Sequence, residues 1–247
     1  MAADAYLTFT EHLEELRWCL IKAVIAVFLG FLVSYFFTDR IFAFMVRPLK
    51  GALGPGESLI GTGVTEAFFL ELKVAGVAGL FGASPVVFYQ IWRFIAPGLR
   101  EREKRLVIPF VVCASVFFVG GAYFCYLAVL PLAFQYFVEQ YRSLGVAPQI
   151  RIGEYFTFFS RMLLAFGVTF ELPVFTFFLV RFGIFDYHFL LRQFRYAILV
   201  IFIVAAILTP GPDVVSQILL AVPLTLLYIL SIGVAYVWRR EDARRDE

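Results

Sequence analysis

Long apolar runs recur along the whole 247-residue chain, and this recurrence constrains the fold more than any other feature. About 20 apolar residues in a helix cross the roughly 30 Å hydrocarbon core of a bilayer. With 62% apolar residues, 16% charged residues and a mean hydropathy of +0.86, the chain has too little polar surface to cover a water-soluble globule. We therefore expect one all-α membrane domain over residues 1–247, with six transmembrane helices at about 19–37, 68–91, 106–130, 155–182, 196–209 and 214–238.

The fifth of these runs is short. Its fourteen residues at 196–209 give about 21 Å of helix, which underfills a typical hydrocarbon core. We expect either a thinner bilayer at this helix or a helix that stops short of one face.

The distribution of Lys and Arg predicts the orientation of the chain. With six spans, both chain ends and the loops 92–105 and 181–195 lie on one side, and they hold fourteen of the twenty-one basic residues. The loops 38–67 and 131–154 and the turn 210–213 hold five, and Lys73 and Arg161 lie near the outer ends of their spans. Because basic loops stay in the cytoplasm, we expect both termini to be cytoplasmic.

Several enzyme classes lack their chemical groups in this sequence. His12 and His188 both fall in predicted cytoplasmic segments, so serines in the membrane have no histidine base at their depth, and no H-E-x-x-H motif is present. The segment 51–58 reads G-x-x-x-x-G-E-S, with Glu57 where a phosphate-binding lysine would be needed. We predict a protein that is not an enzyme, needs no metal or cofactor and binds no nucleic acid.

The N-terminal segment carries an unusual acidic cluster. Thr8 and Glu11 form a capping-box pattern, and Leu13 begins an apolar series at helical spacing, which predicts an amphipathic helix at the cytoplasmic surface. Glu11, Glu14 and Glu15 would lie beside an anionic leaflet, where basic residues are normally favoured. This sign suits capture of a cationic partner, and an ordinary solvated entry helix is the alternative.

A second charged cluster, 100–105, follows an aromatic segment that holds Trp92, Phe94, Pro97 and Gly98. Alternating charge of this kind is typical of a solvated loop with weak ion pairs. The aromatic residues and the turn predict a fixed position for the carboxylates that follow.

Glu171 lies deep in the fourth run. A carboxylate near the middle of a bilayer costs about 3 kcal/mol on insertion scales, so we predict a functional role for it. The structural alternative is that protonated Glu171 donates to a backbone carbonyl that Pro173 leaves free.

Taken together, these segments resemble the twin-arginine translocase subunit TatC family over essentially the whole chain. The matching pieces are HLEELRWCL at 12–20, Arg47-Pro48-Leu49, the segment from Pro85 through Tyr89-Gln90-x-Trp92-x-Phe94-x-x-Pro97-Gly98-Leu99 to Glu103, Phe170-Glu171-Leu172-Pro173, and Thr209-Pro-Gly-Pro-Asp213. Arg100 departs from the family, which commonly has an aromatic residue at that position. We expect structural turns at Pro48, Pro85, Pro210 and Asp213.

The resemblance implies a receptor for the twin-arginine signal peptides of folded proteins. It implies that Glu15 and Glu103 recognise the paired arginines, since a guanidinium forks onto a carboxylate in two parallel hydrogen bonds. The signal-binding set that it implies consists of Glu15, Glu103, Leu16, Arg17, Phe94 and Pro97, with Leu16 and Phe94 close to the apolar part of the signal.

The resemblance also implies partners and a location. The partners are the single-span subunits TatA and TatB, whose helices would dock on the membrane face and meet Glu171, together with further copies of the receptor itself. Export would be driven by the proton-motive force across the inner, cytoplasmic membrane of the cell.

A secondary transporter of a small solute or ion is the alternative function. It would have several charged residues along a central path and broken helices at matched positions. Only Glu171 lies deep in a run, and no matched pair of broken helices is visible.

Overall fold

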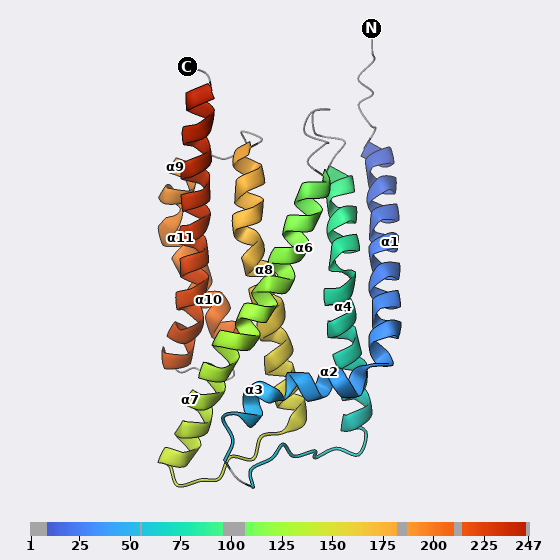
Figure 1. Cartoon of the computed structure of the whole chain (residues 1–247), viewed down its shortest axis with the longest axis vertical. Helices are drawn as coiled ribbons and strands as arrows, with labels where there is room; N and C mark the ends of the chain where they lie inside the picture. Colours follow the sequence, from blue (N-terminus) through green and yellow to red (C-terminus); the bar gives the residue numbers. More distant parts are fainter. Residues whose placement is uncertain (1–8, 55, 96–106, 182–186, 210–213, 246–247) are drawn as a thin grey trace. The chain divides into compact units, whose positions relative to one another are not determined.

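Helices form nearly all of the regular structure. The computed structural model describes residues 9–54, 56–95, 107–181, 187–209 and 214–245, and in these ranges the β-structure is limited to an isolated bridge between Ile60 and Arg151 (Figure 1). The helices are α1 (Phe9–Tyr35), α2 (Thr38–Met45), α3 (Arg47–Lys50), α4 (Glu66–Ile95), α6 (Val107–Phe124), the π-helical turn η2 (Cys125–Val129), α7 (Leu130–Ser143), α8 (Ile152–Arg181), α9 (Tyr187–Arg192), α10 (Phe194–Leu208) and α11 (Val214–Arg245).

Within the described ranges, five helical stretches are long and apolar enough to cross a membrane. They are His12–Tyr35, Glu66–Ile95, Val107–Ser143, Ile152–Arg181 and Val214–Val237. The apolar helix α10 has only 15 residues, about 22 Å. The all-α, multi-pass fold is therefore confirmed, and the sixth crossing stays a prediction.

The chain packs as two compact units. Unit 1 comprises Met1–Ile41 and Glu71–Ser115, and unit 2 comprises Phe42–Leu70 and Val116–Glu247. The helices α2, α4 and α6 contribute residues to each unit, because the division falls inside these three helices.

In unit 1, α1 packs against α4 through a pair of glycines (Figure 1). A Cβ atom added at Gly79 would lie 2.4 Å from the backbone nitrogen of Phe31, and one added at Gly30 would lie 2.6 Å from the carbonyl oxygen of Gly79. The two backbones can approach this closely only because both residues lack a side chain. Gly76 and Gly82 on the same helix α4 face open space.

In unit 2, the centre of the packing is α8, which makes its most extensive helix contacts with α11. The C-terminal half of α6 also crosses α8 closely, because a Cβ added at Gly121 would lie 2.7 Å from the carbonyl oxygen of Phe166. On α8, a Cβ added at Gly167 would lie 2.9 Å from the ring of Phe118. Small residues on both helices thus bring their backbones together.

Two tyrosines of unit 2 bind the last turn of α2. The hydroxyl of Tyr126 donates to the carbonyl oxygen of Phe44 at 2.9 Å, and the hydroxyl of Tyr155 donates to that of Met45. The rings of Phe44 and Tyr126 also stack, with centroids 4.2 Å apart. The carbonyls at the end of a helix have no partner inside the helix, so these hydroxyls satisfy them.

The expected turn at Pro85 is wrong, because Pro85 lies inside α4. A proline cannot donate to the carbonyl four residues earlier, which here belongs to Phe81. The hydroxyl of Ser84 donates to that carbonyl oxygen at 2.8 Å. A neighbouring hydroxyl thus satisfies the freed group and lets the helix continue through the proline.

The other expected turns have different outcomes. Pro48 lies in the first turn of the short helix α3, where its missing N–H costs nothing, so at this position the chain starts a helix. Pro210 and Asp213 lie outside the described residues. The predicted loop 131–154 is mostly helix, because Leu130–Ser143 continues the preceding span without a break. The predicted N-terminal helix is likewise continuous with the first span in α1.

Candidate functional site

The N-terminal turns of α1 present one packed face and one exposed face. Residues three, four and seven positions apart lie on the same side of a helix, so His12, Glu15 and Cys19 share one face. Cys19 is buried, and His12 and Glu15 are half-buried. Leu16 and Leu20 are exposed. The packed face of this segment therefore carries Glu15, and the leucine series points away from it.

The packed face of α1 meets the C-terminal end of α4 through two aromatic rings. The rings of His12 and Phe94 stack with centroids 4.5 Å apart and planes inclined by 19°. Glu15 lies one helical turn from His12 on the same face of α1, so it belongs to the side of α1 that meets α4.

One turn before Phe94, α4 carries a buried amide. Gln90 is only 7% exposed, and its side-chain carbonyl oxygen has no hydrogen-bond partner among the described residues. Trp92, two residues further, is buried and packs on Phe110 with ring centroids 4.4 Å apart. The C-terminal end of α4 thus carries the aromatic rings of Trp92 and Phe94, which we call the aromatic wall. It also carries the buried side-chain oxygen of Gln90, which has no hydrogen-bond partner among the described residues.

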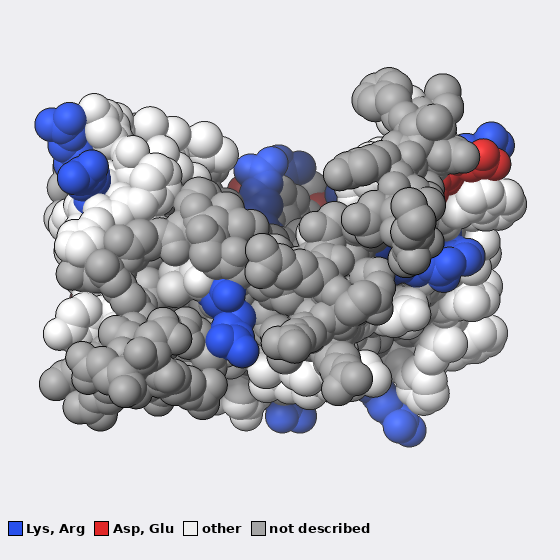
Figure 2. All heavy atoms as spheres, turned by 90° about the horizontal axis from the view of Figure 1, so that it is seen from above, with Lys and Arg blue, Asp and Glu red and all other residues white. Residues whose placement is uncertain are grey.

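The structure places four of the six residues predicted to bind the signal. Glu15 and Phe94 lie on adjoining faces of α1 and α4, and Leu16 and Arg17 are exposed on α1. Figure 2 looks onto the end from which α1 starts, and on the side of α1 it shows red carboxylate side chains directly beside blue basic ones. Pro97 and Glu103 lie outside the described residues.

Glu171 is a second candidate site, in α8 of unit 2. The residue is 3% exposed, and neither of its carboxyl oxygens has a hydrogen-bond partner among the described residues. It lies one turn beyond Gly167, on the face of α8 that meets α6. The described part of unit 2 thus leaves this buried carboxyl group without the backbone hydrogen bond that the structural alternative requires.

Two exposed arginines on α8 lie at equal distances on either side of Glu171. Arg161 and Arg181 are exposed on α8, ten residues before and ten residues after Glu171. At 1.5 Å per residue, each guanidinium-bearing residue lies about 15 Å from Glu171 along the helix. Because their separation matches the roughly 30 Å hydrocarbon thickness, the two arginines suit opposite interfaces and Glu171 suits the middle.

Sequence reasoning assigned no role to Glu66, the first residue of α4. Its carboxylate accepts hydrogen bonds from the backbone N–H groups of Thr62 at 2.7 Å, Gly63 at 3.0 Å and Gly153 at 3.0 Å. Arg151 adds side-chain hydrogen bonds to the hydroxyl of Thr62, the shorter at 2.7 Å. Glu66 therefore joins the segment before α4 to the start of α8.

Sequence reasoning also missed His12 and Gln90 as individual residues. Both lie inside the quoted motifs, so the signal was present, but an aromatic stack between two helices and an orphaned acceptor are properties of packing. A polar amide at the end of an apolar run was the feature that could have singled out Gln90.

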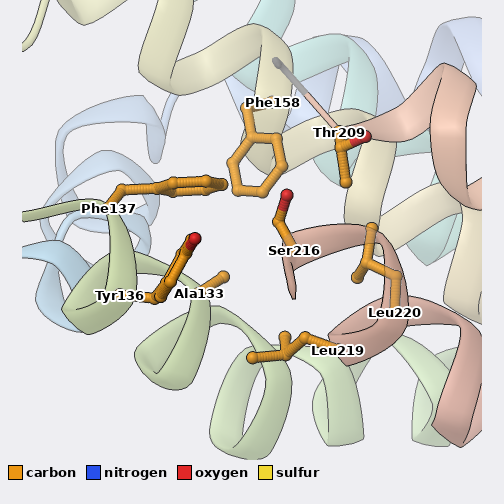
Figure 3. A pocket seen from close by; sticks show the side chains of 8 residues that line it. All are labelled: Ala133, Tyr136, Phe137, Phe158, Thr209, Ser216, Leu219 and Leu220. Atoms are coloured by element: carbon orange, nitrogen blue, oxygen red, sulfur yellow. The ribbon is translucent and has the colours of Figure 1, made fainter. Parts of the chain in front are cut away.

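A small pocket lies in unit 2 among α7, α8 and α11 (Figure 3). It has room for about one water molecule, which is too small for an organic solute. Its lining comprises Ala133, Tyr136, Phe137, Phe158, Thr209, Ser216, Leu219 and Leu220. Among the described residues, no group of three or more His, Cys, Asp or Glu side chains is placed to hold a metal ion.

The five apolar helices of membrane-crossing length among the described residues define a multi-pass α-helical membrane protein. Residues 11–223 match the family model described as Sec-independent protein translocase protein (TatC). The chain is therefore a member of the TatC family of Sec-independent protein translocase proteins.

Individual relatives agree with this family over nearly the full chain. The TatC protein of Desulforapulum autotrophicum is 44% identical over 97% of this chain and 88% of its own length. That of Koribacter versatilis is 42% identical over 97% and 89%, respectively. A crystal structure of the twin arginine translocase receptor TatC superposes with a TM-score of 0.83 at 35% identity, covering 92% of this chain and 99% of that one.

Proposed function

We propose that this protein is the signal-binding receptor subunit of a twin-arginine translocase. Membership of a family of translocase proteins gives the class of function. The observation that carries the receptor role is the half-buried Glu15, held one turn from the His12–Phe94 stack at the end of α4. A carboxylate beside an aromatic wall is suited to a guanidinium group.

In this proposal, the carboxylates of Glu15 and Glu103 each bind one guanidinium of the signal. Each pair forms two parallel N–H···O hydrogen bonds, which the single ammonium of lysine cannot reproduce. Phe94 and Leu16 lie close to the apolar part of the signal, Arg17 borders the site on α1, and Pro97 fixes the chain between Phe94 and Glu103.

The proposed topology has both termini in the cytoplasm and six crossings of the inner membrane. Its support is the excess of Lys and Arg in the terminal segments and in loops 92–105 and 181–195. In this orientation α10 is the short crossing, and the segment that Glu66 joins to α8 lies outside the cytoplasm. Site-specific labelling of single cysteines placed in these segments tests the assignment.

Glu171 is the proposed contact for a partner helix, supplied by TatA or TatB. A buried carboxyl group whose oxygens have no hydrogen-bond partner at normal distance among the described residues is a suitable partner for a polar group of a second helix. Further copies of this chain assemble in the same complex, and the proton-motive force supplies the energy.

The test of the receptor role is binding of a twin-arginine signal peptide to the purified protein in detergent, compared with a twin-lysine version. We expect arginine-selective binding that Glu15→Ala and Glu103→Ala each abolish. Glu14→Ala is the matched control, because Glu14 is the adjacent carboxylate of α1 and is exposed. Equal binding of both peptides by the wild-type protein would refute the receptor role.

A further inference from the structure

The uncompensated carbonyl oxygen of Gln90 requires an explanation. The side chain is 7% exposed, and this oxygen accepts no hydrogen bond from any described residue. Folded proteins pair almost all of their buried polar atoms, because an unpaired one loses its hydration without compensation. A buried acceptor without a partner among the described residues would gain a hydrogen bond from an incoming donor once its side chain turns toward that donor.

Ser84, another buried polar residue on α4, does not share this condition. Ser84, six residues earlier and equally buried, donates to the carbonyl oxygen of Phe81 at 2.8 Å. The buried hydroxyl of Ser84 is therefore hydrogen-bonded, whereas the side-chain oxygen of Gln90 has no partner among the described residues. Gln90 differs from Ser84 in lying next to the candidate signal site.

The position of Gln90 connects it to that site. Gln90 and Phe94 are four residues apart and therefore lie on the same side of α4. Phe94 stacks on His12, which is one turn from Glu15 on α1. The acceptor, the aromatic stack and the carboxylate are thus parts of one region of unit 1.

We propose that Gln90 is a further signal-binding residue, whose buried side-chain carbonyl accepts a hydrogen bond from a guanidinium of the bound signal. This inference rests on the proposed receptor function and adds a third acceptor to the site. Gln90 is a specificity-determining residue in this assignment, because it binds the signal directly.

The chemistry of the guanidinium favours this donor. Arginine presents five N–H groups in a planar fork, and a carboxylate uses two of them. The remaining groups still need acceptors when the side chain leaves water. Gln90 offers one such acceptor, one turn before Phe94 on the same side of α4.

The experiment uses the full chain in detergent and compares Gln90→Met with Gln90→Glu. Methionine keeps the length and the unbranched shape of glutamine but removes the acceptor, and glutamate keeps an acceptor. Ser84→Ala is the control, because it also removes a buried polar group from α4. Each variant is measured twice, for its affinity for the twin-arginine peptide and for its midpoint of thermal unfolding without peptide.

We expect Gln90→Met to bind the twin-arginine peptide about fivefold more weakly. Its unfolding midpoint without peptide should stay level or rise, since the lost acceptor has no partner among the described residues. Gln90→Glu should bind at least as tightly as wild type, and Ser84→Ala should bind as wild type does.

Three results would overturn the assignment. If Gln90→Met binds the peptide with wild-type affinity, Gln90 does not bind the signal, and the proposed receptor function is unaffected. A lowered midpoint in Gln90→Met, in proportion to the lost affinity, would show that water or another group already occupies the acceptor. Failure of the wild-type protein to prefer the twin-arginine peptide would refute both proposals together.

Discussion

The carboxylate of Glu66 accepts a hydrogen bond from the backbone N–H of Gly153 at 3.0 Å, which joins residues 87 positions apart in the chain. The same carboxylate binds the N–H groups of Thr62 and Gly63, and the backbones of Ile60 and Arg151 form a β-bridge alongside. These bonds hold the segment before α4 against the first turn of α8. We call residues 60–66 with 151–153 the loop clasp.

Glu66→Ala should loosen the loop clasp. The amides of Thr62, Gly63 and Gly153 lose their acceptor, so we expect them to exchange with deuterium about ten times faster than in wild type. Hydrogen exchange followed by mass spectrometry measures this rate. Glu71 is an exposed carboxylate five residues further along α4, and Glu71→Ala should leave the rates unchanged.

Gly79→Ala should destabilise unit 1 by about 3 kcal/mol, because the new methyl group would overlap the backbone of α1 at Phe31. Gly76→Ala and Gly82→Ala place the same group in open space on the same helix. We expect a clear fall in the unfolding midpoint for Gly79→Ala alone. Three equal midpoints would mean that α1 and α4 do not approach closely.

His12→Ala should weaken twin-arginine peptide binding about fivefold by removing the ring that packs on Phe94. His12→Phe restores an aromatic ring and should recover most of the affinity. Isothermal titration in detergent separates the two variants. If the phenylalanine variant binds as weakly as the alanine variant, the imidazole acts through a hydrogen bond and the stack has no part in binding.

Glu171→Ala should leave signal binding intact and reduce crosslinking to a single-span partner subunit about threefold, the effect of one interhelical hydrogen bond. Photo-crosslinking yields in membranes measure partner contact, and peptide binding by the same variant serves as the internal control. Glu171→Gln keeps hydrogen-bonding groups and should retain most of the crosslinking. Unchanged yields for the alanine variant would contradict the proposed contact.

Apolar runs predicted the long helices well, because nearly every residue of a helix that crosses the lipid must be apolar. The run at 68–91 lies inside α4, the run at 155–182 overlaps α8 up to its end at Arg181, and the short run at 196–209 corresponds to α10. The family resemblance then supplied the residues around Glu15 and Phe94.

Shorter amphipathic helices were not predicted, because their apolar residues do not form a continuous run. The helices α2 and α3 lie in the predicted loop 38–67, and their packing depends on the hydroxyls of Tyr126 and Tyr155 from distant parts of the chain. No local pattern carries that information.

The glycines of α4 show the same limit at the level of single residues. Gly76, Gly79 and Gly82 recur every third residue along α4, and of these three only Gly79 lies against α1. Residues three positions apart point in somewhat different directions around the helix axis. Which of them contacts the neighbouring helix therefore depends on where the two helices cross. Contact between helices therefore requires the structure.

The π-helical turn η2 marks a place where the chain can change its length. The N–H of Leu130 donates to the carbonyl oxygen of Cys125, five residues earlier, where an α-helix would use the fourth. Such a turn absorbs one extra residue without rotating the helix that follows. Loss of the exposed Leu127 would convert η2 to ordinary α-helix and keep Phe134 and Val138 facing the core. Loss of a residue elsewhere in this helix would swing them by about 100°. Single-residue length variants of the family should therefore be tolerated at 125–129 and selected against on either side.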